Sequence, residues 1–528
     1  MSESRSLLRS AGAMSAATFV SRILGLAREQ AQAYYFGAGF ATDAFNAAFR
    51  IPNLLRDLFA EGAMSSAFVP TFTATREREG EEAAWRLASR TITVLVVVLG
   101  AFTLLLLAGA PWILRVYTPG FAPDKLALAA TMTRILSPFL LCVALAALAM
   151  GVLNTLRVFF LPALAPAWFN VACIAGMIVL PPLLVPAGLD PILSLAIGAM
   201  AGGILQFAVQ LPTMRRRGFR FRWEFSPRDP GVVRIAGLML PATFGLAATQ
   251  INLLVDTSLA SRFGDGPISW LQCAFRLIQL PIGLFGVAIA TANLARVSRD
   301  RARGDHEAMR RNLGGAIRAA ALLTLPATAG LVALREPIIR VLFEHGKFDA
   351  TATTATGAAL LCYALGLHAY AVTKIQVPVF YALGETRVPV VSSAISVAAK
   401  IAANFALIAL LPHLGLDPFL ALALTTSLAA WLNLGLLGWG SRKRLGSLAG
   451  LGVVPTTLKM ALVSVVLGFA AAGVHAGLVS AWPASGLVPE IVRLAVASFV
   501  GVAIAVGGAL ALRVDEARAL LARIRRRT

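Results

Sequence analysis

Arginine side chains recur in the apolar N-terminal stretch of residues 21–70, where they could bind a phosphate-bearing ligand. Arg22 and Arg28 lie six residues apart, and Arg50 and Arg56 repeat that interval. Six helical residues correspond to about 120° around the helix axis, so each pair can line one broad cavity. A guanidinium group binds two phosphate oxygens at once through its planar fork. This pattern predicts a site for an anionic headgroup inside a membrane.

Acidic residues share this stretch and leave a second interpretation open. Asp43 lies near the start of the second apolar segment, and Asp57 and Glu61 lie near its end. An ionisable group at the bilayer centre costs about 2.5–3.5 kcal/mol on insertion scales, so such groups face water or one another. The arginines of the second segment could therefore bind a ligand or form structural ion pairs. We expect Asp43 to orient an arginine or to gate the outer mouth rather than to contact the ligand.

The composition is typical of a polytopic membrane protein. Of the 528 residues, 58% are hydrophobic and only 14% are charged, whereas a soluble protein of this length is about one-quarter charged. Arg22 interrupts the apolar run in which a signal peptide would need its continuous core, so we expect a retained first helix. The four cysteines form no C-x-x-C pair and the five histidines show no metal-ligand spacing. We therefore expect no disulfide, metal or other cofactor.

Apolar segments long enough to cross a bilayer recur along the whole chain. A spanning helix needs about 20 mostly apolar residues. We therefore expect an all-α polytopic membrane protein with about fourteen transmembrane helices. They are expected near residues 10–30, 38–59, 87–112, 129–155, 160–184, 188–212, 232–260, 267–293, 311–335, 353–383, 387–412, 416–440, 455–478 and 489–513.

Basic residues concentrate in alternate connections between these segments, and this alternation sets the predicted orientation. The connections assigned to one side carry most of the net charge of +21, including the arginine-rich run at 215–223. Cytoplasmic loops carry the excess of lysine and arginine in membrane proteins, so we expect both termini in the cytoplasm. The positive charge thus reflects topology and does not indicate a nucleic-acid partner.

Short sequence matches at a nearly constant offset indicate an internal repeat. The triplet Ala-Thr-Phe at 17–19 recurs at 242–244, and the triplet Ala-Phe-Arg at 48–50 recurs at 274–276. Because six intervening helices restore the same orientation, such a repeat is parallel, about an axis along the membrane normal. Arg276 would then lie opposite Arg50 across this pseudo-twofold axis.

The repeat predicts three parts of the chain. We expect an N-terminal six-helix lobe at 1–225 and a second six-helix lobe at 226–445. The remaining residues, 446–528, would form two extra transmembrane helices and a basic cytoplasmic tail. A cavity between two such lobes is the usual place for a transported ligand in repeat-built transporters.

Five longer motifs resemble those of a known family. They are SRILGLARE (21–29), FGAGFATDAFNAAFRIPNLLR (36–56), AEGAMSSAFVP (60–70), VLFEHGKF (341–348) and FYALGETRVP (380–389). Together they resemble the MviN/MurJ lipid II flippases, part of the multidrug/oligosaccharidyl-lipid/polysaccharide exporter superfamily. The resemblance implies transport of lipid II, the undecaprenyl-diphosphate-linked peptidoglycan precursor, from the inner to the outer leaflet of the bacterial cytoplasmic membrane. It implies no covalent chemistry, so we expect no enzyme.

The resemblance also implies roles for individual residues and partners. The two C-terminal helices would form a groove for the polyprenyl tail. Cell-wall synthesis enzymes are candidate partners, and we expect a monomer. Glu29 and Asp43 would serve as gate or charge partners. The cavity arginines of the family fall on Arg22, Arg28, Arg50, Arg56 and Arg276.

The chain departs from the family pattern where ion coupling is concerned. Phe275 and Gln279 stand where relatives often carry acids, so the cavity is more cationic than usual. Some relatives hold sodium with groups of the seventh and eleventh helices. Asp256 and Asn404 match part of that pattern and are candidate ion-coupling residues, but Ile408 stands in place of the second acid. We therefore do not expect a complete sodium site.

Other function classes remain open at this point. Cavity chemistry alone does not distinguish lipid II from another polyprenyl-diphosphate-linked glycan. A cation-coupled multidrug exporter would share the fold, but it would need an acidic, aromatic-lined cavity, whereas this stretch is basic. A membrane-embedded glycosyltransferase would need carboxylates or histidines placed for acid–base work, and the sequence shows no such pair.

Overall fold

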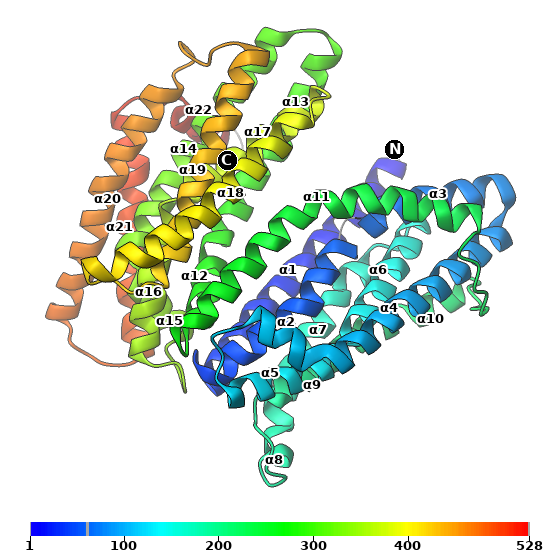
Figure 1. Ribbon diagram of the computed structural model, residues 1–528. Helices are drawn as coiled ribbons and strands as arrows, with labels where there is room; N and C mark the ends of the chain where they lie inside the picture. Colours follow the sequence, from blue (N-terminus) through cyan, green and yellow to red (C-terminus); the bar gives the residue numbers. More distant parts are fainter. Residues whose placement is uncertain (1, 60–62, 526–528) are drawn as a thin grey trace. The chain divides into compact units, whose positions relative to one another are not determined.

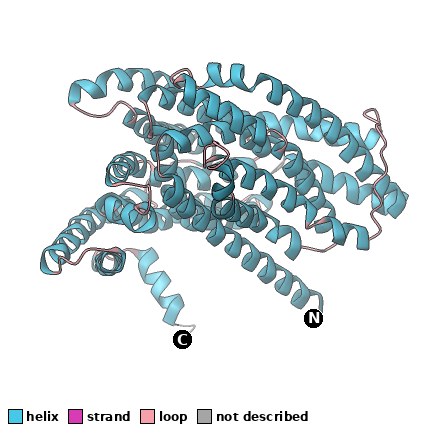
Figure 2. Cartoon of the chain, turned by 90° about the horizontal axis from the view of Figure 1, so that it is seen from below, coloured by secondary structure: helices cyan, strands magenta, loops and turns pink. Residues whose placement is uncertain are grey.

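The structure is a computed structural model that describes residues 2–59 and 63–525 (Figure 1). Within these ranges the secondary structure is helical and contains no strand, as the second view also shows (Figure 2). Contacts within the chain define two compact units. Unit 1 comprises Met1–Ser269 and His345–Phe348, and unit 2 comprises Trp270–Glu344 and Asp349–Thr528.

Unit 1 contains eleven α-helices, a short 3₁₀ helix and the first turn of α12 among its described residues. They are α1 (Ser2–Phe36), α2 (Phe40–Phe59), α3 (Ala63–Glu79), α4 (Glu81–Tyr117), α5 (Pro123–Leu136), α6 (Phe139–Thr155), α7 (Phe160–Val179), α8 (Pro181–Leu184), α9 (Leu193–Ala208), α10 (Leu211–Arg216), α11 (Pro230–Ala260), η1 (Ser261–Phe263) and the start of α12 (Pro267–Pro281).

Unit 2 continues from α12 through the C-terminal helices. Its further elements are η2 (Ile282–Val287), α13 (Ala288–Ala302), α14 (His306–Ala333), α15 (Arg335–Phe343), α16 (Ala350–Ala364), α17 (Leu367–Ala382), α18 (Arg387–Leu410), η3 (Leu411–Leu414), α19 (Leu420–Leu445), α20 (Val453–Ala481), α21 (Leu487–Ala511) and α22 (Asp515–Arg525).

Aromatic side chains fill the part of unit 1 that carries the predicted site. Phe49 of α2 stacks on Phe169 of α7 with ring centres 6.2 Å apart, and Phe139 of α6 lies 5.5 Å from the same ring. Helix α7 also packs against α1 and α9. Because each aromatic ring buries a large apolar surface, this cluster holds α1 and α2 on a common support.

The length and apolarity of the helices confirm the polytopic all-α fold. Ten helices in the described ranges can cross a membrane by these criteria, or eleven when the bent pair α16–α17 counts as one span. All fourteen predicted ranges fall on helices. The number of fourteen spans stays a prediction, because α1, α2 and α11 are not among the helices that meet the criteria.

Several of the predicted spans are interrupted, and two of these breaks lie in unit 2. Helix α12 ends at Pro281 and continues as the π-helix η2, and α16 meets α17 at an angle of 44°. At the second break, Trp431 Nε1 donates a hydrogen bond to the Leu365 carbonyl at 2.9 Å. Ser427 Oγ donates to the Cys362 carbonyl at 2.7 Å. These side chains satisfy carbonyl groups near the break, as a membrane interior requires.

The compact units and the predicted repeat divide the chain at different residues. Helix α11, the first helix of the predicted second lobe, packs against α2, α3 and α4 in unit 1. Helices α20 and α21 pack against each other and against α14 in unit 2. The predicted lobe boundaries at 225/226 and 445/446 follow the sequence repeat and differ from the boundaries of the compact units. These lobe boundaries stay predictions.

Candidate functional site

Arg28 of α1 lies against α7 in unit 1. Its guanidinium carbon is 5.4 Å from the centre of the Phe169 ring, and its Nη2 is 3.4 Å from Glu29 Oε1. Asn170 Nδ2 donates a hydrogen bond to the Ser21 carbonyl at 3.2 Å, which fixes α1 on α7. The Nε of Arg28 is buried and has no hydrogen-bond partner among the described residues. Arg22, by contrast, is exposed.

A polar face of α2 carries the second group of predicted residues. Asp43, Asn46 and Arg50 share this face, because helical residues three and four apart are neighbours. Arg50 is half-buried, and its Nε is also without a hydrogen-bond partner within the described ranges. Both Arg50 and Asp256 of α11 lie within electrostatic range of the Tyr117 hydroxyl. The Tyr117 hydroxyl thus interacts with both a predicted ligand-binding arginine and the predicted ion-coupling carboxylate.

Asp43 is fully buried, and both of its carboxylate oxygens are engaged. Oδ1 accepts hydrogen bonds from the Ser269 amide at 2.8 Å and the Ser269 hydroxyl at 2.6 Å. Oδ2 accepts from the Gly266 amide at 2.7 Å and from Lys125 Nζ at 3.2 Å. Asn46 Nδ2 donates to the Ser269 hydroxyl at 3.1 Å. Asp43 therefore binds the N-terminal turn of α12 and a lysine of α5.

Lys125 and Ser269 complete this cluster, and sequence reasoning missed both. Lys125 is 2% exposed, and its ammonium group lies 2.8 Å from Asp265 Oδ1 and 4.5 Å from the centre of the Phe121 ring. A buried lysine needs such partners, because an unpaired charge is expensive to bury. The only signal in the sequence was a lysine beside an apolar segment, which a solvated loop explains equally well.

The remaining predicted residue of α2 is Arg56, which is half-buried. Asp57 and Glu61 are two acids that could neutralise the arginines of α2. Glu61 lies outside the described residues, and so does the side chain of Asp57. Ligand binding by Arg56 therefore stays a prediction.

In unit 2, Arg276 is exposed on α12. It lies five residues before Pro281, where the helix changes to η2. The preceding residue, Phe275, packs edge-on against Tyr363 of α16 with ring centres 5.3 Å apart. Single π-helical turns inside α-helices are frequent at functional sites, and Arg276 lies close to such a turn.

Asn404 of α18 is fully buried in unit 2 and accepts a hydrogen bond from the Thr425 hydroxyl of α19. Lys400 lies one helical turn earlier and is 3% exposed. Residues four apart share a helix face, so a buried cation neighbours the predicted ion-coupling amide. Sequence reasoning missed both Lys400 and Thr425.

A short clasp in unit 1 joins the end of α1 to the VLFEHGKF motif. Lys347 N donates a hydrogen bond to the Tyr34 carbonyl at 2.9 Å. Gly37 and Gly346 have φ values of 68° and 62°. A Cβ on Gly37 would lie 2.5 Å from the Lys347 carbonyl oxygen, and one on Gly346 would lie 2.2 Å from the Tyr34 carbonyl oxygen. Only glycine fits at either position, because both the backbone conformation and the close approach exclude a side chain.

Among the described residues, no three histidines, cysteines or acids lie close enough together to hold a metal ion. The site contains guanidinium and ammonium groups and the buried carboxylate of Asp43. This arrangement suits binding of an anion more than acid–base or metal chemistry. Long apolar helices with buried charges between them define a polytopic membrane protein, and buried charges in such helices are typical of transporters.

Comparisons with known proteins identify the family. The family model described as "Lipid II flippase MurJ" matches residues 32–496. The chain is 38% identical over 445 residues to the lipid II flippase MurJ of Burkholderia cenocepacia, covering 83% of this chain and 84% of that protein. It is 37% identical over 443 residues to the probable lipid II flippase MurJ of Vibrio cholerae, covering 82% of each. The chain belongs to the lipid II flippase MurJ family.

Solved structures agree with this assignment. A structure described as lipid II flippase MurJ in an inward closed conformation matches with a TM-score of 0.76 and 27% identity, covering 96% of this chain and 99% of that one. An inward-facing multidrug transporter of the MATE family and MOP superfamily matches with a TM-score of 0.67 at 14% identity, covering 81% and 95%. The second match shows the fold alone. The protein is a multi-pass bacterial membrane protein.

Proposed function

We propose that this protein is a lipid II flippase that moves the undecaprenyl-diphosphate-linked precursor from the inner to the outer leaflet by alternating access. The observation that carries this proposal is the state of Arg28 and Arg50. Each has a buried Nε donor without a hydrogen-bond partner in the described part of the chain. A diphosphate offers the oxygen acceptors that such donors need. The curated relatives, named lipid II flippases, supply the identity of the lipid.

The finer assignments follow from the same proposal. Arg22, Arg56 and Arg276 complete the cations that bind the headgroup. Asp43 acts as a gate residue, supported by its hold on the first turn of α12. Asp256 and Asn404 are the candidate ion-coupling residues. The protein works as a monomer without a cofactor or covalent step, with both termini in the cytoplasm, and it supplies cell-wall synthesis enzymes with substrate.

Depletion of the protein in its native cells tests this function. Lipid II should accumulate on the cytoplasmic side, and re-expression of the wild-type chain should clear it. Labelling of externally exposed lipid II in spheroplasts with a membrane-impermeant, amine-reactive reagent measures the flipped fraction. Accumulation of a different polyprenyl-diphosphate-linked glycan, with lipid II unchanged, would instead establish the alternative substrate. Unchanged levels of all lipid-linked glycans would refute the proposal.

A further inference from the structure

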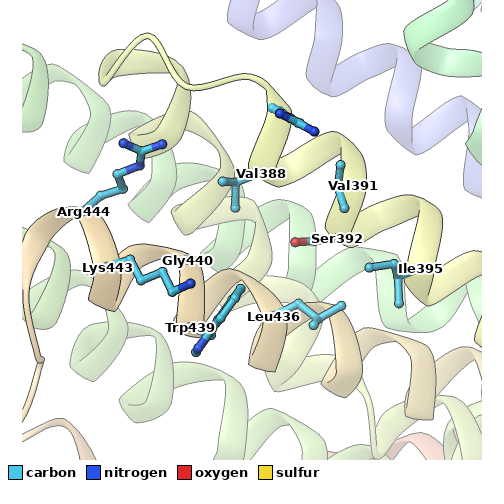
Figure 3. Close-up of a pocket in the computed structure, with 10 residues that line it drawn as sticks. Val388, Val391, Ser392, Ile395, Leu436, Trp439, Gly440, Lys443 and Arg444 are labelled. Atoms are coloured by element: carbon cyan, nitrogen blue, oxygen red, sulfur yellow. The ribbon is translucent and has the colours of Figure 1, made fainter.

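A pocket of about 420 Å³ lies in unit 2 between the beginning of α18 and the end of α19 (Figure 3). Its lining combines a cationic side with an apolar side. The cationic residues are Arg387, Lys443 and Arg444, and the others are Val388, Val391, Ser392, Ile395, Leu436, Trp439 and Gly440. None of these residues belongs to the candidate site described above.

Close packing of the two helices forms one wall of the pocket. A Cβ on Gly440 would lie 2.7 Å from Val388 Cγ1, so a larger residue would push α18 and α19 apart. Helix α18 begins at Arg387, whose amide donates a hydrogen bond to Glu385 Oε1 at 3.1 Å. The positive end of the helix dipole also lies at this end of the pocket.

The cationic side of the pocket is only partly neutralised. Arg444 Nη2 lies 2.5 Å from Glu385 Oε2. Lys443 Nζ lies 3.5 Å from the centre of the Trp439 ring, a contact that orients the ammonium group and leaves its charge uncompensated. Arg387 makes no ion pair within the described ranges. Three cations thus face one carboxylate, so the pocket complements an anion.

The apolar side continues onto an exposed surface of the two helices. Val391 and Ile395 are 45% and 46% exposed, and Trp439 is 62% exposed. Tryptophan and lysine are enriched at the level of lipid headgroups, and both residues stand here at the basic end of α19. An occupant therefore needs an anionic head for the cations and hydrocarbon chains for the apolar wall.

We propose that this pocket binds an anionic glycerophospholipid of the leaflet that faces the basic connections. Its phosphodiester lies between Arg387 and Lys443, and its acyl chains follow Val391 and Ile395. Basic pockets between transmembrane helices on the cytoplasmic side bind lipid headgroups in this way. The lining residues are different from the arginines of the candidate site, so this proposal does not depend on the proposed flippase activity.

Lipid titration of the intact protein in detergent, followed by native mass spectrometry, tests the proposal. Phosphatidylglycerol should bind and phosphatidylcholine of the same chain length should bind more weakly. Each cation near a lipid surface contributes about a fivefold change in affinity. The double variant R387Q/K443Q should therefore lose phosphatidylglycerol affinity about 25-fold. The control variant R301Q/R303Q removes two exposed arginines at the end of α13 and should bind like the wild type.

A second variant should raise the affinity for phosphatidylglycerol instead of lowering it. Glu385 neutralises Arg444 and its Oε1 accepts a hydrogen bond from the Arg387 amide at 3.1 Å. E385Q keeps an acceptor for that amide but removes the charge, so phosphatidylglycerol affinity should rise about fivefold. Equal binding of phosphatidylglycerol to wild type and R387Q/K443Q would overturn the proposal. So would binding of undecaprenyl diphosphate at this pocket with no binding of phosphatidylglycerol.

Discussion

The carboxylate of Asp43 accepts both the amide and the hydroxyl hydrogen of Ser269, which lies 226 residues further along the chain. Ser269 stands in the first turn of α12, where backbone amides have no partner inside the helix. Asp43 thus caps α12 from α2, while Lys125 of α5 balances its charge. Three helices of unit 1 meet at one buried carboxylate.

Replacing this carboxylate should destabilise the protein strongly. Asp43→Asn leaves Lys125 buried with only the half-exposed Asp265 as an ion-pair partner. Breaking a buried pair in this way costs about 3–5 kcal/mol, so the melting temperature in detergent should fall markedly. Ser269→Ala removes one hydroxyl and should cost about 1 kcal/mol. Asp265→Asn is the control, with a loss of at most about 1 kcal/mol. A wild-type melting curve for Asp43→Asn would contradict this role.

The arginines of the candidate site should be needed for transport rather than for folding. Arg22→Ala, Arg28→Ala, Arg50→Ala and Arg276→Ala should each abolish complementation of a depleted strain while membrane levels stay normal. Arg28→Lys should rescue only partly, because an ammonium group lacks the bidentate fork. Immunoblotting of membranes provides the expression control, and Arg301→Ala provides the matched exposed arginine. Full growth of all four alanine variants would show that these residues do not bind the headgroup.

The glycine clasp should be sensitive to a single methyl group. Gly37→Ala and Gly346→Ala each introduce a Cβ within 2.5 Å of a carbonyl oxygen, so the hydrogen bond between Lys347 and Tyr34 should break. Both variants should melt at a lower temperature and flip lipid more slowly in proteoliposomes. Gly188→Ala is the matched control, because Gly188 has a φ of 70° and nothing within 4 Å of its Cβ position. If all three variants lower the melting temperature and the flipping rate equally, the positive φ value alone would explain the loss, without the close contact.

The sequence was sufficient to predict the elements but not their long-range partners. Apolar length placed all fourteen predicted ranges on helices, whereas the role of Arg28 in ligand binding stays a prediction. The partnership of Asp43 with Lys125 joins residues 82 positions apart, and no local pattern encodes such a distance. Pro378 stands inside α17 without interrupting it. The bend lies instead at Leu365 and Gly366, where side chains of α19 satisfy the freed carbonyls.

The membrane potential should power the transport cycle. The sequence contains no G-x-x-x-x-G-K-[ST] motif, so we expect no direct use of ATP. The diphosphate is anionic and the cytoplasm is the negative side, so each charge moved outward gains about 2.3 kcal/mol per 100 mV. The arginines stay with the protein, and the same potential assists the return of the empty, positively charged cavity.

Flipping should therefore slow when an ionophore collapses the potential while the proton and sodium gradients are held constant. Asp256 is the competing source of coupling, because it is an acidic residue of α11 that interacts with the Tyr117 hydroxyl. If the charge of the headgroup couples transport to the membrane potential, the flipping rate of Asp256→Asn should depend on the potential as that of the wild type does. Undiminished flipping without a potential would exclude this energy source, and a loss of flipping only in Asp256→Asn would then assign the coupling to an ion bound at Asp256.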